Sequence, residues 1–264
     1  MGLIKTVIKW VLIVFVLLVL LGALLGGQSD QQTKSTDQQQ QEGTITTVQE
    51  GLANLPNEYD SSAVQKYEII KIEDISIKAL EKPLSEYSSS ELNNLPMNVR
   101  MQYRVLLPIG VSETELKSTL IQLVLDETSK NTDIDEISVF AYERKEDSSG
   151  AYTLGMLEWC PNGQWDGVTA EIASSNDRSS YAYNIEIKDK VAKPDSIERP
   201  TEKDFEIYDY YQQVYSEEFE KLDLSDPYAT VNYDIVYQRV ADQFGITKEE
   251  VDQITKKVAL YNVQ

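Results

Sequence analysis

Histidine is absent from this chain of 264 residues, and cysteine occurs once, at Cys160. Without histidine the chain cannot build a serine–histidine–aspartate triad, use an imidazole as a general base or offer the commonest zinc ligand. A single cysteine forms no internal disulfide, so the fold has to depend on its apolar core. We interpret Cys160 as a buried structural residue, because a nucleophilic thiol without a histidine partner would be unusual. The sequence predicts neither a metal site nor a cofactor.

Basic residues are scarce: 24 Lys and Arg stand against 44 Asp and Glu, a formal net charge of −20. This charge argues against a nucleic-acid partner, because neutralising phosphates requires clustered Lys and Arg. The sequence also has no phosphate-binding glycine motif, no Gly-x-Ser-x-Gly elbow and no Cys-x-x-Cys. Two carboxylates suffice for glycoside hydrolysis, but pairs such as Glu143 with Glu158 are expected by chance in so acidic a chain. We therefore expect a protein that is not an enzyme.

One long apolar run, residues 10–25 (WVLIVFVLLVLLGALL), has no charged or strongly polar side chain. A helix of roughly 20 apolar residues crosses a bilayer, and this run with its neighbours reaches the lower limit. Lys5 and Lys9 precede the run, and the first charge after it is Asp30. Basic residues favour the cytoplasmic side, so the sequence predicts a single-pass signal-anchor, with the lipid bilayer as partner and the remainder outside the cell. A cleaved signal peptide is the alternative.

Composition divides the chain into four parts. Residues 1–27 form the expected transmembrane anchor, and residues 28–63, rich in Gln, Ser and Thr, are expected to be a flexible tether. Residues 64–193 carry strand and helix patterns that predict an α+β domain. Residues 194–264 begin with a proline-containing boundary and continue with helical patterns, which predicts a small helical module.

The α+β domain is predicted from strand patterns at residues 67–77, 97–107, 136–144, 151–160 and 181–187. Ser112 and Glu115 form a capping box that predicts a helix over residues 113–129. The order of these elements implies an antiparallel sheet with one helix packed across it. Further helices are expected at residues 204–222 and 234–244, and a third after Thr247.

An aromatic cluster around the Asn162-Gly163 turn is the best candidate for a binding site. Aromatic rings near a turn can form a platform for sugars or peptides, with Asn and Asp side chains supplying polar contacts. The alternative is that the two tryptophans only cover one end of the sheet. The residues expected to contact a ligand are Tyr152, Trp159, Asn162, Trp165 and Asp166.

Two stretches are familiar. Residues 67–75, the helix from Ser112 and GAYTLGMLEWCPNGQW (residues 150–165) together resemble an uncharacterised prokaryotic domain family with no assigned activity. The tail from IYDYY (residues 207–211) through RVADQFGITKEEVDQI (residues 239–254) resembles a helical segment of membrane-tethered or secreted prokaryotic proteins. The resemblance implies an α+β fold and a location in the cell envelope, and it brings no catalytic residues.

These observations favour an extracytoplasmic binding or interaction module of the cell envelope, with a protein or a glycan as its partner. Two other functions stay open. A structural envelope component could self-associate through its helical tail, and a hydrolase could use two carboxylates on envelope polymers.

Overall fold

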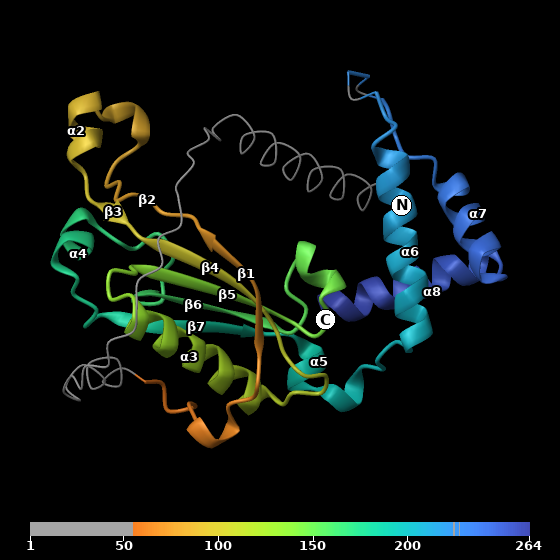
Figure 1. The fold of residues 1–264 in the computed structure, drawn as a ribbon, viewed down its shortest axis with the longest axis horizontal. Helices are drawn as coiled ribbons and strands as arrows, with labels where there is room; N and C mark the ends of the chain where they lie inside the picture. The colour runs from red at the N-terminus through yellow and green to blue at the C-terminus, as the bar shows by residue number, and fades with distance from the viewer. Residues whose placement is uncertain (1–54, 224, 227) are drawn as a thin grey trace, which may run out of the picture. The chain divides into compact units, whose positions relative to one another are not determined.

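The computed structural model describes residues 55–264 except 224 and 227 (Figure 1). The elements in chain order are η1 Ser61–Ala63, β1 Glu68–Asp74, β2 Ile77–Lys78, η2 Leu84–Glu86, α2 Ser89–Asn94, β3 Met97–Asn98, β4 Arg100–Leu106, α3 Glu113–Lys130, β5 Glu136–Tyr142, η3 Glu146–Ser149, β6 Gly155–Pro161, α4 Ala170–Ser175, β7 Tyr181–Ile187, α5 Asp189–Ala192, η4 Pro194–Ser196, α6 Glu202–Phe219, α7 Tyr233–Phe244 and α8 Lys248–Val263.

Five strands form the main sheet in the order β1-β4-β5-β6-β7. The prediction of an antiparallel sheet is wrong at one position, because β4 and β5 run parallel, with Arg100 beside Glu136 and Leu106 beside Tyr142. Parallel neighbours need a crossover connection, and α3 provides it by returning the chain to the end of the sheet where β4 began. The sheet is therefore mixed, since its other three pairings are antiparallel.

Helix α3 lies along one face of the sheet (Figure 1) and builds the core of the domain with it. Its predicted capping box is confirmed: the hydroxyl of Ser112 accepts from the N–H of Glu115, whose carboxylate accepts from the N–H of Ser112. The helix buries Leu116, Leu120, Ile121, Leu123 and Val124 against strand residues such as Val105, Ile137, Val139 and Leu157. Burying each such side chain contributes about 1.5–3 kcal/mol. This cluster therefore supplies most of the apolar stabilisation of the sheet.

The fold class predicted above also included a transmembrane helix, and the structure does not support that part of it. Within residues 55–264, as far as they are described, every helix is too short or too polar to cross a membrane. The expected anchor at residues 10–25 lies outside the described residues, as does most of the expected tether at residues 28–63. The described chain is a mixed α+β fold with a five-stranded sheet followed by C-terminal helices.

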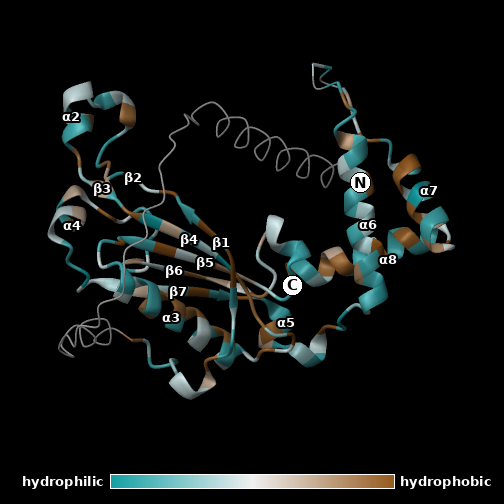
Figure 2. Cartoon of the chain, in the orientation of Figure 1, coloured by the Kyte–Doolittle hydropathy of each residue, from teal (hydrophilic) through white to brown (hydrophobic). Residues whose placement is uncertain are grey.

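The second face of the sheet has polar side chains at its centre with apolar ones such as Phe140 and Met156 beside them, and we call it the polar face. Because side chains alternate along a strand, the residues between those of the core point to this side. The strands accordingly show both hydrophilic and hydrophobic residues along their length (Figure 2). The register of the four pairings places one polar residue from every strand in a single row, the polar row, which consists of Glu73, Gln102, Ser138, Glu158 and Asn184.

The sheet has two ends that differ in what covers them. At the turn end, β4 and β5 begin and β6 ends, and the loops there include α4 and residues 75–98, which we call the arm. At the opposite end, β5 finishes and β6 begins, and η3 and α5 follow. We call it the joint end, because side chains of α6 and α8 contact the sheet region there. The arm exposes several large apolar side chains: Ile75, Ile77, Leu80, Leu84 and Met97.

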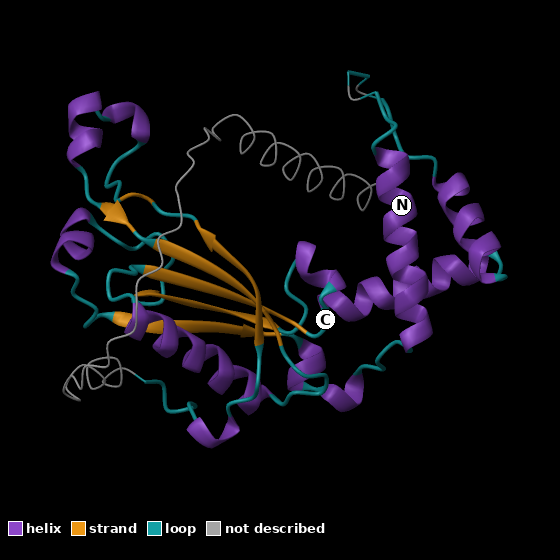
Figure 3. Cartoon of the chain, viewed as in Figure 1, coloured by secondary structure: helices purple, strands orange, loops and turns teal. Residues whose placement is uncertain are grey.

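Helices α6, α7 and α8 follow the strands in the chain and form the helical module, which Figure 3 draws as helices joined by loops. The predicted helices are confirmed within a few residues, including the capping box of Thr247 and Glu250 and the end of α7 at Gly245, whose φ is +66°. The module has apolar clusters of its own, centred on Val214, Val236 and Val240 and, separately, on Phe205 with Val258. The domain boundary expected at residues 193–194 stays a prediction.

Candidate functional site

The five residues predicted to contact a ligand do not form one cluster. Tyr152 precedes β6 and Asn162 follows it, so the seven-residue strand separates them. At about 3.3 Å per residue, the two positions lie roughly 20 Å apart or more. The structure therefore places Tyr152 at the joint end and Asn162, Trp165 and Asp166 at the turn end.

Two of the predicted aromatic rings already have partners. Trp159 is 8% exposed in the core, with its ring centroid 4.5 Å from that of Tyr181. Tyr152 stacks on Phe140 with centroids 5.9 Å apart, and Nζ of Lys188 lies 4.5 Å from the centre of the Tyr152 ring. These contacts favour the structural interpretation of both rings over a free binding platform.

The turn after β6 brings the other three predicted residues over the polar face. Asn162, Gly163 and Asp166 all have positive φ values, of +54°, +67° and +68°. The N–H of Asp166 donates to Oε1 of the buried Glu136 at 2.9 Å, which holds the backbone in this conformation. Non-glycine residues in the left-handed region cost about 1–3 kcal/mol each and often occur at functional sites.

Arg100 connects this turn to the sheet. Its Nε lies 2.5 Å from Oε2 of Glu136, and its Nη2 donates to Oδ1 of Asp166 at 2.6 Å. The guanidinium carbon is 5.4 Å from the centre of the Trp165 ring, within range of a cation–π contact. The side chain of Arg100 is 9% exposed, that of Glu136 is fully buried and that of Asp166 is 70% exposed. Arg100 therefore joins the buried carboxylate of Glu136 to the exposed carboxylate of Asp166 and also contacts the ring of Trp165.

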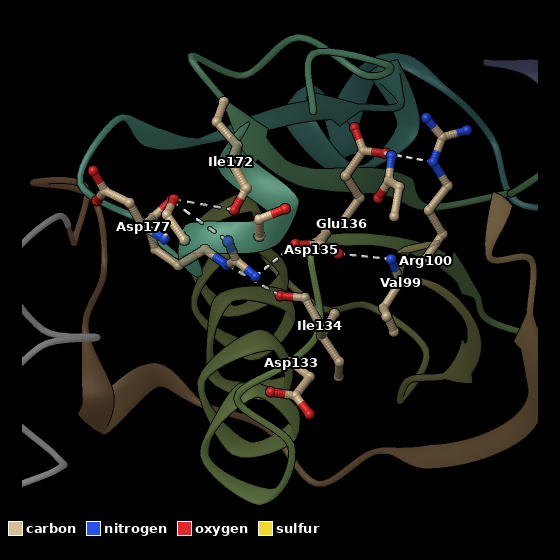
Figure 4. Close-up of polar contacts among 12 residues, drawn as sticks. Val99, Arg100, Asp133, Ile134, Asp135, Glu136, Ile172 and Asp177 are labelled. Atoms are coloured by element: carbon tan, nitrogen blue, oxygen red, sulfur yellow. Dashed lines mark hydrogen bonds and ion pairs between the residues drawn. The ribbon is translucent and has the colours of Figure 1, made fainter. Parts of the chain in front are cut away.

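Two consecutive residues at the start of β5 carry buried carboxylates that point in different directions, that of Glu136 toward Arg100 and that of Asp135 toward the N–H of Val99 (Figure 4). Burial raises the pKa of Glu136, although hydrogen bonds from Asn98 and Arg100 oppose that rise. Burial likewise raises the pKa of Asp135, which accepts from the N–H of Val99 at 2.7 Å and from Nη2 of Arg178 at 2.7 Å. Each carboxylate is fixed between protein donors, so both serve to position loops of the turn end.

The polar row crosses the middle of the same face. Nε2 of Gln102 donates to Glu73 at 3.0 Å, and Nδ2 of Asn184 donates to Glu158 at 3.3 Å. Ser138 stands between these two pairs and is only 4% exposed, yet its hydroxyl has no hydrogen-bond partner among the described residues. A buried hydroxyl without a partner costs about 1–3 kcal/mol, so its presence at the centre of a polar surface calls for an explanation.

The sequence reasoning missed Arg100, Glu136 and Ser138 as members of the site. The alternation in residues 97–107 predicts that Arg100 lies on the outer face of the sheet, but nothing in that pattern indicates an ion pair with Glu136, a residue 36 positions away in the chain. Ser138 could have been found from the sequence of β5 (EISVFAY), because it is a small polar residue that stands between the apolar Ile137 and Val139.

The two glutamates named above as a possible catalytic pair, Glu143 and Glu158, do not have the spacing of a glycosidase site. The described residues contain no group of three or more His, Cys, Asp or Glu side chains able to hold a metal ion. Glu158 pairs with Ser138, five residues before Glu143, so the two glutamates are separated by about 17 Å along the sheet, beyond the roughly 5–9.5 Å used by glycosidases. Cys160 is buried, and burial raises the pKa of its thiol to about 12.

Comparison with known proteins adds no relative. No protein-family model, no curated protein and no solved structure matches this chain. The resemblance noted from the sequence stays a prediction, and function has to be argued from the geometry above.

Proposed function

We propose that this chain is a non-catalytic binding module whose ligand is a polyhydroxylated chain, such as an oligosaccharide, lying along the polar row. The observation that carries this proposal is the row of hydrogen-bonding side chains, in which two amide–carboxylate pairs, Gln102 with Glu73 and Asn184 with Glu158, stand on either side of Ser138. The amides and carboxylates of these two pairs keep further hydrogen-bonding capacity for the hydroxyls of a ligand that lies along the row.

The chemistry of the row fits sugars better than peptides. A sugar hydroxyl both donates and accepts, and the row offers amide donors, amide carbonyls and carboxylate acceptors side by side. Peptide ligands usually need apolar pockets for anchoring side chains or a free strand edge, and the row supplies neither. Four strand spacings of about 4.8 Å make the row about 19 Å long, which suits an extended ligand of several units.

The turn end extends this surface on the same face. Trp165 and the exposed carboxylate of Asp166 contact Arg100. Arg100 lies two residues before Gln102 in β4, so both side chains point to the polar face. An aromatic ring next to carboxylate and amide groups suits a sugar ring, which has an apolar face and polar edges. Asn162, Trp165 and Asp166 therefore remain in the proposed site, whereas Tyr152 and Trp159 act as structural residues beside it.

Titration with a panel of oligosaccharides, followed by backbone amide shifts, tests the proposal. We expect shifts in β5 and β6 for at least one sugar, and about a tenfold or greater loss of affinity in Asn184→Ala, because one to two hydrogen bonds are removed. Gln213→Ala is the matched control, since Gln213 is an exposed amide on α6 that also bonds a glutamate. Binding of peptides to this face with no response to any sugar would overturn the proposal.

A further inference from the structure

Helices α6 and α8 contact the joint end of the sheet through charged and aromatic side chains, and we call this contact the joint. Its members come from six separate parts of the chain. They are Glu143 and Arg144 after β5, Asp147 in η3, Lys190 in α5, Arg199 before α6, Phe205 and Asp209 in α6, and Tyr261 and Asn262 in α8.

The innermost part of the joint is a buried ion pair. Nζ of Lys190 lies 3.3 Å from Oε1 of Glu143, with the two side chains 3% and 2% exposed. The other carboxylate oxygen accepts from the hydroxyl of Tyr261 at 3.3 Å, and Nε of Arg199 lies 3.7 Å from it. The ring of Tyr261 also covers the ammonium group, whose Nζ is 3.9 Å from the ring centre. Tyr261 of α8 therefore covers the ion pair of Lys190 and Glu143. The pair is shielded from water only while α8 stays in place.

The outer part of the joint links α6 and α8 to η3. Arg144 is hydrogen-bonded to Asp209, and its guanidinium carbon lies 4.1 Å from the centre of the Phe205 ring. Nδ2 of Asn262 donates to Oδ1 of Asp147 at 3.3 Å. The segment that carries Arg144 and Asp147 is thus held from both helices.

Two features indicate that this contact is weak compared with the cores on either side. Each buried apolar cluster of the described residues lies within the sheet domain or within the residues from Ile197 onward, and none spans both. Five of the buried side-chain atoms without a hydrogen-bond partner in the described part of the chain belong to the joint: Nη1 of Arg144, Oδ2 of Asp147, Nε and Nη2 of Arg199, and Oδ1 of Asn262. Water would satisfy these atoms after separation, and buried ion pairs barely offset their own desolvation.

The joint is connected to the polar face through η3. Arg104, which lies on that face beside Phe140, donates to the carbonyl oxygen of Ser148. The hydroxyl of Tyr142 donates to the carbonyl oxygen of Gly150 at 3.0 Å. The position of η3 over this end of the face therefore depends on contacts from the sheet below and from the helical module beside it.

We propose that the helical module separates reversibly from the sheet at the joint, and that its docked state holds η3 in place over the joint end of the polar face. Undocking would free η3 and enlarge the accessible polar face. The effect on ligand binding rests on the proposed function, whereas the coupling between the joint and η3 does not.

Hydrogen exchange on the full chain without ligand tests the coupling, using Asp209→Asn. This change removes the charge that pairs with Arg144 and leaves the helix intact. We expect the amides of Ser148 and Gly150, which donate to carbonyls within and beside η3 in the native state, to exchange about tenfold faster, as the loss of a charge-assisted hydrogen bond implies. Glu217→Gln is the matched control on the same helix, because Glu217 pairs with Arg239 inside the module and is similarly exposed.

Three results would overturn the coupling: unchanged exchange in η3, an equal rise in Glu217→Gln, or a parallel rise in the amides of α7, which would mean that the module unfolds. The oligosaccharide titration is then repeated on Asp209→Asn. Faster exchange with no sugar binding in any variant refutes the proposed function and leaves the joint standing. Sugar binding with unchanged exchange refutes the joint alone.

Discussion

Replacing Arg100 by alanine isolates the ion pair at the turn end of the sheet. The substitution leaves the fully buried carboxylate of Glu136 with the amide of Asn98 and the N–H of Asp166 as its remaining donors. Removing one partner of a buried pair costs about 3–5 kcal/mol, because the other charge stays buried without compensation. We expect this loss in the free energy of unfolding at pH 7.

The cost should depend on pH, and the sign follows from the pKa of Glu136. Burial raises that pKa above its ordinary value of 4.5, and Arg100 opposes the rise, so the pKa climbs further in Arg100→Ala. A carboxyl with a raised pKa in the folded state contributes stability below pH 4.5 and loses it as the pH rises through the folded pKa. Because a tenfold change in proton affinity corresponds to about 1.4 kcal/mol, we expect the substitution to cost at least about 1 kcal/mol less at pH 4 than at pH 7.

Urea unfolding at pH 4 and pH 7, followed by circular dichroism, measures both quantities. Adding Glu136→Gln to the Arg100→Ala variant should restore part of the lost stability at pH 7, since it removes the uncompensated charge. Arg239→Ala is the control, because Arg239 is 37% exposed and pairs with Glu217 and Glu218 at the surface, where a pair contributes at most about 1 kcal/mol. A loss below about 1 kcal/mol in Arg100→Ala, or the same loss at both pH values, would refute the reasoning.

Three further outcomes are expected. Gly155→Ala should lower the free energy of unfolding by at least about 1–3 kcal/mol in urea titrations, because the added Cβ would lie 2.5 Å from the carbonyl oxygen of Glu186, whereas Gly150→Ala should change it little. Cys160 should react with a disulfide reagent at pH 8 only as the chain unfolds in urea, because burial raises the pKa of its thiol to about 12; rapid reaction in the native protein would contradict this. Leu120→Ala, at a fully buried position of α3, should cost about 2–5 kcal/mol by the same unfolding assay.

Local sequence signals predicted the helices well. The capping boxes at Ser112 and Thr247 depend on residues three positions apart, and both are formed. A third capping box, Ser88 with Glu91, begins α2 between two of the predicted strands, where no helix was expected. Its motif was visible, but the helix is only six residues long and buries none of them, so the apolar periodicity that reveals longer helices is absent.

Structural features that depend on contacts between distant parts of the chain could not be predicted from such local signals. The parallel pairing of β4 with β5 follows from where α3 returns the chain, which no residue of either strand specifies. The candidate site shows the same limit. Asn162, Trp165 and Asp166 lie in one turn, whereas Tyr152 lies at the other end of β6, because closeness in sequence across a strand is not closeness in space.

The arm has a consequence for engineering this fold. Asp74 pairs with Met101, and the N–H of Ile75 donates to the carbonyl oxygen of Arg100, so β1 and β4 are the two sides of a hairpin whose turn has been replaced by a long insertion. Closing a loop of twice the length costs only about 0.6 kcal/mol more, so the sheet can carry segments of very different length at this position. Foreign sequences, or a reporter domain with adjacent termini, can therefore be grafted between Ile75 and Asn98 with the five-stranded sheet as their scaffold.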